Sequence, residues 1–248
     1  MNLNFMKKNK DSGFTLLELL IVIAIIAILS VALVLVLNPA ETLKKARDSQ
    51  RISDLSTIKT AIGLYMTSVS PAYLGGTADN NFCKPTVMQV GTPTSTLAWT
   101  GATMKISYSV PTATSTLNDP TLDGSTVATY RQSATAAAAS ATNGTGWIPV
   151  NFDNISGGSP ISNIPLDPTN TVASVTVITS ADLVYRYGCA VSPLTYEIDA
   201  QLESTAYTST DDKRASDGGN SSAYYETGTN LSILGTTTTG TPANNVDY

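Results

Sequence analysis

The feature that most constrains this chain of 248 residues is an apolar run of 24 residues, Phe14 to Leu37, close to its N-terminus. Between Leu19 and Leu37 the one polar residue is Ser30. As a helix, the segment from Leu19 to Leu37 spans about 28 Å, close to the thickness of the hydrocarbon part of a bilayer. Apolar side chains would surround this helix, leaving no side for water. The run therefore predicts a helix that spans a membrane or lies in the core of an assembly.

A short basic leader precedes the apolar run. It carries Lys7, Lys8 and Lys10, has no apolar segment of its own, and ends in Gly13. An ordinary secretory signal places its apolar region before the cleavage site, whereas here the candidate site after Gly13 comes before that region. Cleavage there would keep the apolar helix in the mature protein. The alternative is an uncleaved signal anchor in which the glycine is incidental.

One carboxylate, Glu18, interrupts the apolar run five residues after Gly13. The stretch Lys-Asp-Ser-Gly-Phe-Thr-Leu-Leu-Glu, residues 10–18, resembles the processing site of the type IV pilin and pseudopilin family. The resemblance implies that a peptidase cuts between Gly13 and Phe14 and that the new amino group of Phe14 is methylated. It also implies that Glu18 pairs with the Phe14 ammonium of a neighbouring subunit, since an unpartnered carboxylate in an apolar bundle is costly. The alternative is an interfacial Glu18 that water reaches.

Residues 38–68 have the pattern of an amphipathic helix. Asn38, Pro39 and Glu41 resemble the start of a helix with a capping box, so either a second helix begins here or one long helix bends. Apolar residues then recur every three or four positions, and charged residues occupy much of the rest of the helix. The apolar stripe consists of Ile52, Leu55, Ile58, Ile62 and Tyr65. We predict that this stripe packs on a globular head, and residues 44–55 are similar to the corresponding helix of pseudopilins.

Beyond residue 68 the sequence changes to short segments between turn residues, typical of a β-rich domain. Candidate strands occupy residues 105–110, 172–179, 183–187 and 194–199, the last two joined by a loop over residues 188–193. Residues 111–146 contain runs rich in Thr, Ala and Ser, such as residues 134–142, which we interpret as insertions or loops, with a short helix as the alternative. The segments Leu166-Asp167-Pro168 and Tyr185-Arg186-Tyr187 resemble part of the pseudopilin head.

The expected fold is therefore α+β, with a long N-terminal helix, half membrane-type and half amphipathic, packed on a β-rich globular head. We divide the chain into a leader (1–13), a transmembrane or filament-core helix (14–37), an amphipathic helix of the head (38–68) and an extracytoplasmic head with loop insertions (69–248). The basic leader favours a cytoplasmic N-terminus, although four basic residues after the span oppose that orientation.

The composition of the sequence argues against two classes of function, nucleic-acid binding and histidine-based catalysis. Residues 69–248 hold six basic and fourteen acidic side chains, a net charge of −8, which argues against nucleic acid as a partner. The chain has no histidine, which removes His-based triads, metal ligands and acid–base catalysis. We read the acidic pair Glu197 and Asp199 as a solvated strand face rather than a catalytic dyad. We therefore expect no enzymatic activity.

Two further features of the head are candidate sites. Cys83 and Cys189 could form a disulfide if the head lies outside the cytoplasm, and two buried free thiols are the alternative. Oxygen-bearing side chains in one glycine-containing loop could hold Ca²⁺, with a plain solvated loop as the alternative. They are Asp211, Asp212, Asp217 and Asn220. No other cofactor is expected.

The family resemblance implies a structural subunit of a type IV pilus or of a type II secretion-like pseudopilus. Such a subunit is stored in the cytoplasmic membrane with its head outside, and then enters a cell-surface or periplasmic filament. The implied partners are copies of itself in a helical filament, a prepilin peptidase, a membrane assembly platform with its ATPase, and membrane lipid. The alternatives are a single-pass anchored binding protein or adhesin that does not polymerise, and an anchored enzyme.

Overall fold

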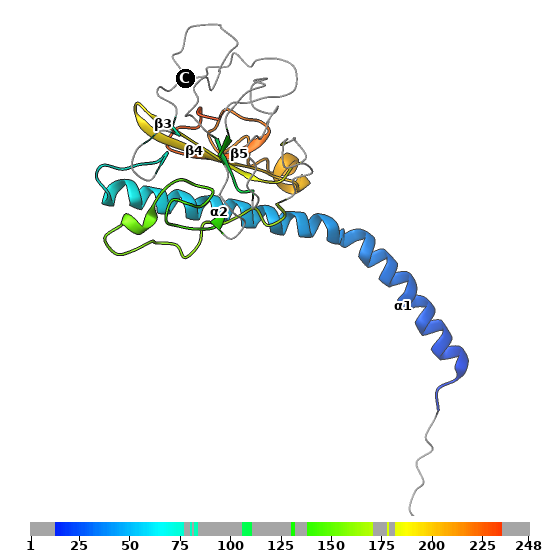
Figure 1. The fold of residues 1–248 in the computed structure, drawn as a ribbon. Coiled ribbons are helices and arrows are strands. Elements are labelled where there is room, and N and C mark those ends of the chain that lie inside the picture. The colour runs from blue at the N-terminus through cyan, green and yellow to red at the C-terminus, as the bar shows by residue number, and fades with distance from the viewer. Residues whose placement is uncertain are drawn as a thin grey trace, which may run out of the picture. The chain divides into compact units, whose positions relative to one another are not determined.

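The computed structural model describes residues 13–76, 80, 82–83, 106–110, 130–131, 138–170, 178 and 182–234. The chain forms two compact units, Met1–Leu43 and Lys44–Tyr248. The helices and strands are α1 (Leu16–Leu37), α2 (Pro39–Ser68), β1 (Ile106–Tyr108), β2 (Tyr130–Arg131), β3 (Tyr185–Val191), β4 (Leu194–Gln201) and β5 (Tyr224–Gly228) (Figure 1). A 3₁₀ helix, η2 (Phe152–Asn154), and a π-helical turn, η3 (Ala206–Thr210), complete the described elements.

Asn38 separates the two helices. It adopts a left-handed conformation, with φ of 36° and ψ of 71°, which Asn tolerates better than most residues. Pro39 then starts α2, at a position where its missing N–H has no helical partner to lose. The backbone N–H of Glu41 donates to the Asn38 side chain at 3.4 Å and to its carbonyl at 3.1 Å. Of the two alternatives in the sequence, the structure has a second helix that begins at Pro39.

The head contains one five-stranded sheet with the order β2-β1-β3-β4-β5. The pairs β1–β3, β3–β4 and β4–β5 are antiparallel, and β2 pairs with β1 in parallel. The ladder between β3 and β4 continues to the pair Val191 and Leu194, so Ser192 and Pro193 alone connect the hairpin. The prediction of a loop over residues 188–193 is wrong in its extent, because β3 continues through Gly188 to Val191.

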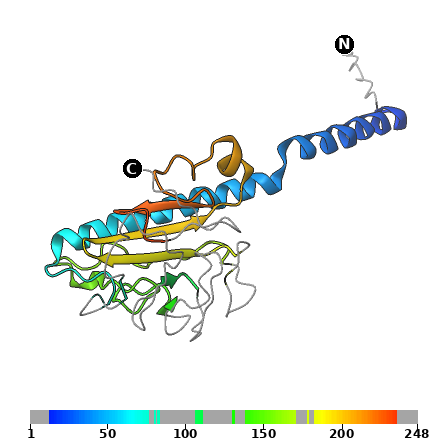
Figure 2. The ribbon, with the colours of Figure 1, turned by 90° about the horizontal axis from the view of Figure 1, so that it is seen from above.

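Strands β3, β4 and β5 run alongside α2 (Figures 1 and 2), and the larger core lies between this helix and one face of the sheet. The predicted stripe of α2 is buried there, except Ile52, which is partly exposed. Three tyrosines of the sheet, Tyr185, Tyr187 and Tyr196, contribute their rings to the same core. The indole N–H of Trp147 donates to the carbonyl of Pro165 at 2.8 Å. These contacts confirm the α+β layout of a helix packed on a β-rich head.

A second apolar cluster covers the opposite face of the sheet. Side chains from β1 and β3 meet residues that follow β5 in this cluster, whose members are Ile106, Tyr108, Val110, Ile178, Val184, Ala190, Ile233 and Leu234. Both faces of the sheet are thus covered, and six consecutive residues of β3, Tyr185 to Ala190, are buried. The polar residues of these strands therefore need partners inside the protein.

Arg51 of α2 is the centre of a buried ion network. Its guanidinium binds both carboxylate oxygens of Asp167 (2.7 and 3.1 Å) and one oxygen each of Asp48 (2.7 Å) and Glu203 (2.8 Å). The side chains of Arg51, Asp48 and Asp167 are fully buried. The network joins α2 to the loop before β3 and to the segment after β4. Part of the predicted charged face of α2 is therefore buried against the head.

Several predictions concern segments outside the described residues. They include the leader apart from Gly13, the candidate strand 172–179 apart from Ile178, and most of the loop region 111–146.

Candidate functional site

The side chains of Thr15 and Glu18 cap the N-terminus of α1. Thr15 is the N-cap residue: its hydroxyl oxygen accepts the backbone N–H of Glu18 at 3.2 Å. In return, Glu18 Oε2 accepts the backbone N–H of Thr15 at 2.9 Å and its hydroxyl proton at 2.8 Å. This is a complete capping box, which satisfies N–H groups that have no partner within the helix. The carboxylate also lies at the helix end where the dipole favours negative charge.

The capping role of Glu18 was not part of the sequence interpretation, which assigned its carboxylate to a neighbouring subunit. The Thr-x-x-Glu spacing in front of an apolar run was the signal that could have revealed it. The two roles are compatible, because both hydrogen bonds that Thr15 donates to this carboxylate go to the same oxygen, Oε2. The capping box thus fixes where the carboxylate lies along the helix.

The peptide bond between Gly13 and Phe14 precedes the helix. Both residues are exposed and lie outside helical structure, and the Phe14 side chain is 86% exposed. A Cβ added at Gly13 would meet no atom within 4 Å, so nothing in the described chain requires glycine there. A requirement for glycine at this position would therefore come from another molecule.

Helix α1 exposes apolar side chains around its whole circumference. The large apolar side chains that the structure describes in this helix are at least 48% exposed. The hydroxyl of Ser30 donates to the carbonyl of Ile26 at 2.7 Å, so this polar group is satisfied within the helix. Among the described residues, one helical segment is long and apolar enough to cross a membrane, and α1 supplies its apolar part. An apolar medium or other apolar helices would cover this surface.

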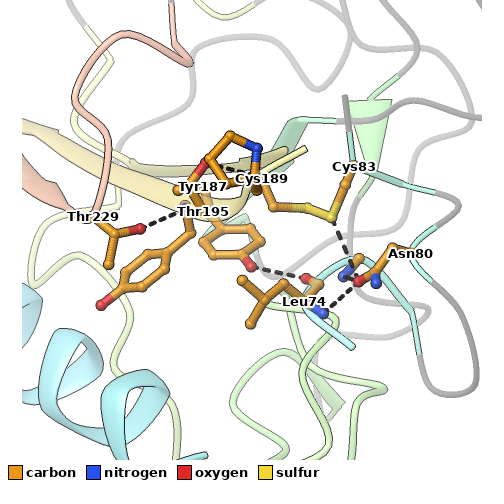
Figure 3. The surroundings of a disulfide bond; sticks show 10 residues. Leu74, Asn80, Cys83, Tyr187, Cys189, Thr195 and Thr229 are labelled. Atoms are coloured by element: carbon orange, nitrogen blue, oxygen red, sulfur yellow. Dashed lines mark hydrogen bonds between the residues drawn. A yellow bond between two sulfur atoms is a disulfide. The ribbon is translucent and has the colours of Figure 1, made fainter. Parts of the chain in front are cut away.

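Cys83 and Cys189 are joined in a disulfide, with a Cα–Cα distance of 4.6 Å (Figure 3). The bond ties the segment after α2 to strand β3. A side chain on Gly75 would lie 2.5 Å from the Cys83 sulfur, so glycine at this position leaves room for the bond. Asn80 Oδ1 accepts the N–H groups of Leu74 and Gly75 at 2.7 and 3.2 Å. The predicted pairing is thus present, in a buried and hydrogen-bonded setting.

Replacing both cysteines with serine is expected to destabilise the head by about 2–4 kcal/mol, because the closed loop restricts the unfolded chain. Denaturant unfolding of the full-length variant in detergent measures this. The reduced wild-type protein is the matched control and should unfold at the same denaturant concentration as the double variant. A double variant as stable as the oxidised wild type would contradict the expectation.

The four residues of the candidate calcium loop have other partners or point to solvent. Asp211 lies 2.7 Å from the Lys213 ammonium, and Asp212 binds the Arg214 guanidinium at 2.9 Å. Asp217 accepts the backbone N–H groups of Gly219 and Glu226 at 2.8 and 2.7 Å, and Asn220 is exposed. Within the described parts of the chain, no group of three or more His, Cys, Asp or Glu is placed to hold a metal ion. The calcium site stays a prediction.

The acidic pair of β4 is not solvated. Glu197 and Asp199 are 0% and 1% exposed. Asp199 accepts two hydrogen bonds from Arg186, both at 2.7 Å. The predicted solvated strand face is therefore wrong, because a second apolar cluster covers that face of the sheet.

These observations define the class of the protein: an apolar, membrane-type helix with a capped N-terminus, followed by an α+β head. Residues 8–34 match the family described as the prokaryotic N-terminal methylation motif, which is the signature of type IV pilins and pseudopilins. The match includes the leader end, Gly13, Phe14 and Glu18. No curated protein and no solved structure matches the chain.

Proposed function

We propose that the chain is a structural subunit of a type IV pilus or of a type II secretion-like pseudopilus. The observation that carries the proposal is the methylation motif on an exposed apolar helix whose one carboxylate is fixed at its N-terminus. A membrane covers such a helix before assembly, and other copies of the helix cover it afterwards. Its role is structural rather than catalytic, in line with a sequence that has no histidine.

Processing is the step that makes the subunit competent for assembly. A prepilin peptidase cuts the exposed bond between Gly13 and Phe14, and the amino group of Phe14 is methylated. The exposure of this bond and the lack of any internal need for Gly13 support the assignment. The implied partners are this peptidase, an assembly platform with its ATPase, and membrane lipid.

The precursor crosses the cytoplasmic membrane once, with the leader inside and the head outside. The disulfide of the head supports this orientation, because disulfides persist in oxidising compartments. After assembly the head lies at the cell surface or in the periplasm. Two resemblances to pseudopilins favour the pseudopilus over the pilus: the helix of residues 41–68, and the head segments that contain Asp167 and Arg186.

Imaging tests the filament directly. An epitope-tagged chain expressed in its native host is expected to appear along the length of sheared filaments by immunogold electron microscopy. The matched control is the same host without the assembly ATPase, in which the chain should stay in the membrane fraction. A chain confined to the membrane in both hosts would instead indicate an anchored binding protein that does not polymerise.

Calcium in the loop of Asp211, Asp212, Asp217 and Asn220 remains a secondary proposal. Its support is an oxygen-rich loop next to glycines, which suits a hard cation. The proposal predicts a higher melting temperature in Ca²⁺ than in chelator, and a smaller difference for Asp217→Asn. Equal melting temperatures of the wild type in the two conditions would dispose of the site.

A further inference from the structure

The face of the sheet that lies away from α2 carries buried charges. One guanidinium and three carboxyl groups are at most 2% exposed there: Arg186, Glu197, Asp199 and Glu226. Arg186 lies opposite Asp199 in the ladder and binds both of its oxygens. Its guanidinium also lies 3.5 Å from the centre of the Tyr224 ring. The remaining two carboxyl groups, Glu197 and Glu226, lie on the neighbouring strands β4 and β5, and each carboxyl group shifts the pKa of the other.

The two oxygens of Glu197 have different surroundings. Oε2 accepts the backbone N–H groups of Ile233 and Leu234, both at 2.7 Å. Oε1 is buried, and no N–H or O–H group of the described residues donates a hydrogen bond to it. The neighbouring Glu226 is itself an acceptor, and its Oε2 takes the N–H of Ser221 at 2.8 Å. Two ionised carboxylates cannot hydrogen-bond to each other, whereas a protonated carboxyl group can donate to an ionised one.

We propose that Glu197 is protonated in the folded head, donates a hydrogen bond to Glu226, and thereby makes the stability of the sheet face that residues 233–234 cover depend on pH. These two residues, the strap, are held through Glu197 Oε2 and pack in the second apolar cluster. The strap lies close against β3, because a Cβ added at Gly188 would be 2.8 Å from the Leu234 side chain. Gly188 is the residue opposite Glu197 in the ladder.

The charged and titratable groups around Glu197 come from three strands and one loop. Strand β3 supplies Arg186, and β4 itself supplies Asp199, which Arg186 neutralises. Strand β5 supplies Glu226 and Tyr224, and the loop before β5 supplies Asp217, which accepts the N–H of Glu226. The strap contributes two uncharged side chains. Loss of the Glu197 proton would thus place a second negative charge beside Glu226 in a buried site.

The direction of the pH effect follows from the pKa of Glu197. Burial, and then the neighbouring Glu226, raise this pKa well above the ordinary value of 4.5. Between the ordinary and the raised pKa the folded head holds a proton that the unfolded chain has lost. The unfolding free energy therefore falls as pH rises through that interval. The stabilisation is complete below pH 4.5 and disappears above the raised pKa.

Glu197→Gln tests the proposal, because a carboxamide has the shape and the donor of a protonated carboxyl group at every pH. We expect the melting temperature of full-length wild type, in detergent and chelator, to fall by about 5 °C or more between about pH 5.5 and pH 8.5. We expect the variant to lose less than half as much over the same range. Glu41→Gln, the same substitution in the first turn of α2, is the matched control and should follow the wild type.

The pH dependence separates this role from a purely structural one. If the wild type and Glu197→Gln differ by the same amount at every pH, Glu197 holds no proton and the proposal fails. If the variant does not fold, NMR of the wild type labelled at the glutamate carboxyl carbons decides, since the chain has five glutamates. One resonance should keep the shift of a protonated acid at pH 7. Glutamate resonances that all show the shift of an ionised carboxylate at pH 7 would overturn the proposal.

Discussion

Replacing Arg51 with alanine is expected to destabilise the head by about 3–5 kcal/mol, the largest effect we expect on its stability. The guanidinium makes hydrogen bonds of 2.7 to 3.1 Å to three carboxylates, and its side chain is fully buried. Its removal leaves Asp48 and Asp167 buried without this counterion. The measurement is denaturant unfolding of the full-length protein in detergent.

Lys59→Ala provides the matched control for Arg51→Ala. Lys59 is an exposed cation on the same helix, so its loss should change the unfolding free energy by about 0.5 kcal/mol or less. The wild type should also lose stability in acid, because Arg47 and Arg51 lower the pKa of Glu203 to about 2. That contribution is present above pH 4.5 and is lost as pH falls towards 2. An Arg51→Ala protein within about 1 kcal/mol of wild type would show that the network adds little.

The second large effect concerns assembly. Glu18→Leu and Glu18→Gln are each expected to insert into the membrane normally and to abolish filaments. Glutamine can still accept the N–H of Thr15, so it keeps that part of the capping box while it removes the charge. Loss of filaments in Glu18→Gln would therefore assign the effect to the charge that pairs with a neighbouring Phe14 ammonium.

Thr15→Ala provides the complementary control. It removes the hydroxyl that caps α1 and contacts Glu18, but leaves the carboxylate in place. We expect filaments to persist in this variant in reduced amount, because a cap contributes only about 0.5–2 kcal/mol. Membrane fractions and counts of sheared filaments give the readout. Normal filaments from Glu18→Gln would refute the pairing role of Glu18.

The two N-terminal helices, α1 and α2, could be predicted from the sequence because the signals for them are local. A membrane-type helix depends on the length and apolarity of one segment, and the stripe of α2 depends on spacing within one helix. The disulfide could be predicted because the chain has two cysteines, both in the head. The layout of a helix on a β-rich head followed from the same patterns.

The buried charges of the head could not be predicted, because their burial depends on contacts distant in sequence. Arg51 and Asp167 are 116 residues apart, and Glu197 is covered by residues 36 and 37 positions later. Alternation along β4 indicated two faces but not that both are covered, so its acidic residues were read as solvated. Asp167 and Arg186 belong to the segments that resemble pseudopilin heads, and each forms a buried ion pair.

Intact-mass and N-terminal peptide mass spectrometry of the chain from sheared filaments tests the central claim most directly. The account predicts a mature protein that begins at Phe14, lacks residues 1–13 and carries one added methyl group on its amino terminus. A Gly13→Leu variant should keep its leader and stay in the membrane. Filaments built from chains that still begin at Met1 would contradict the account.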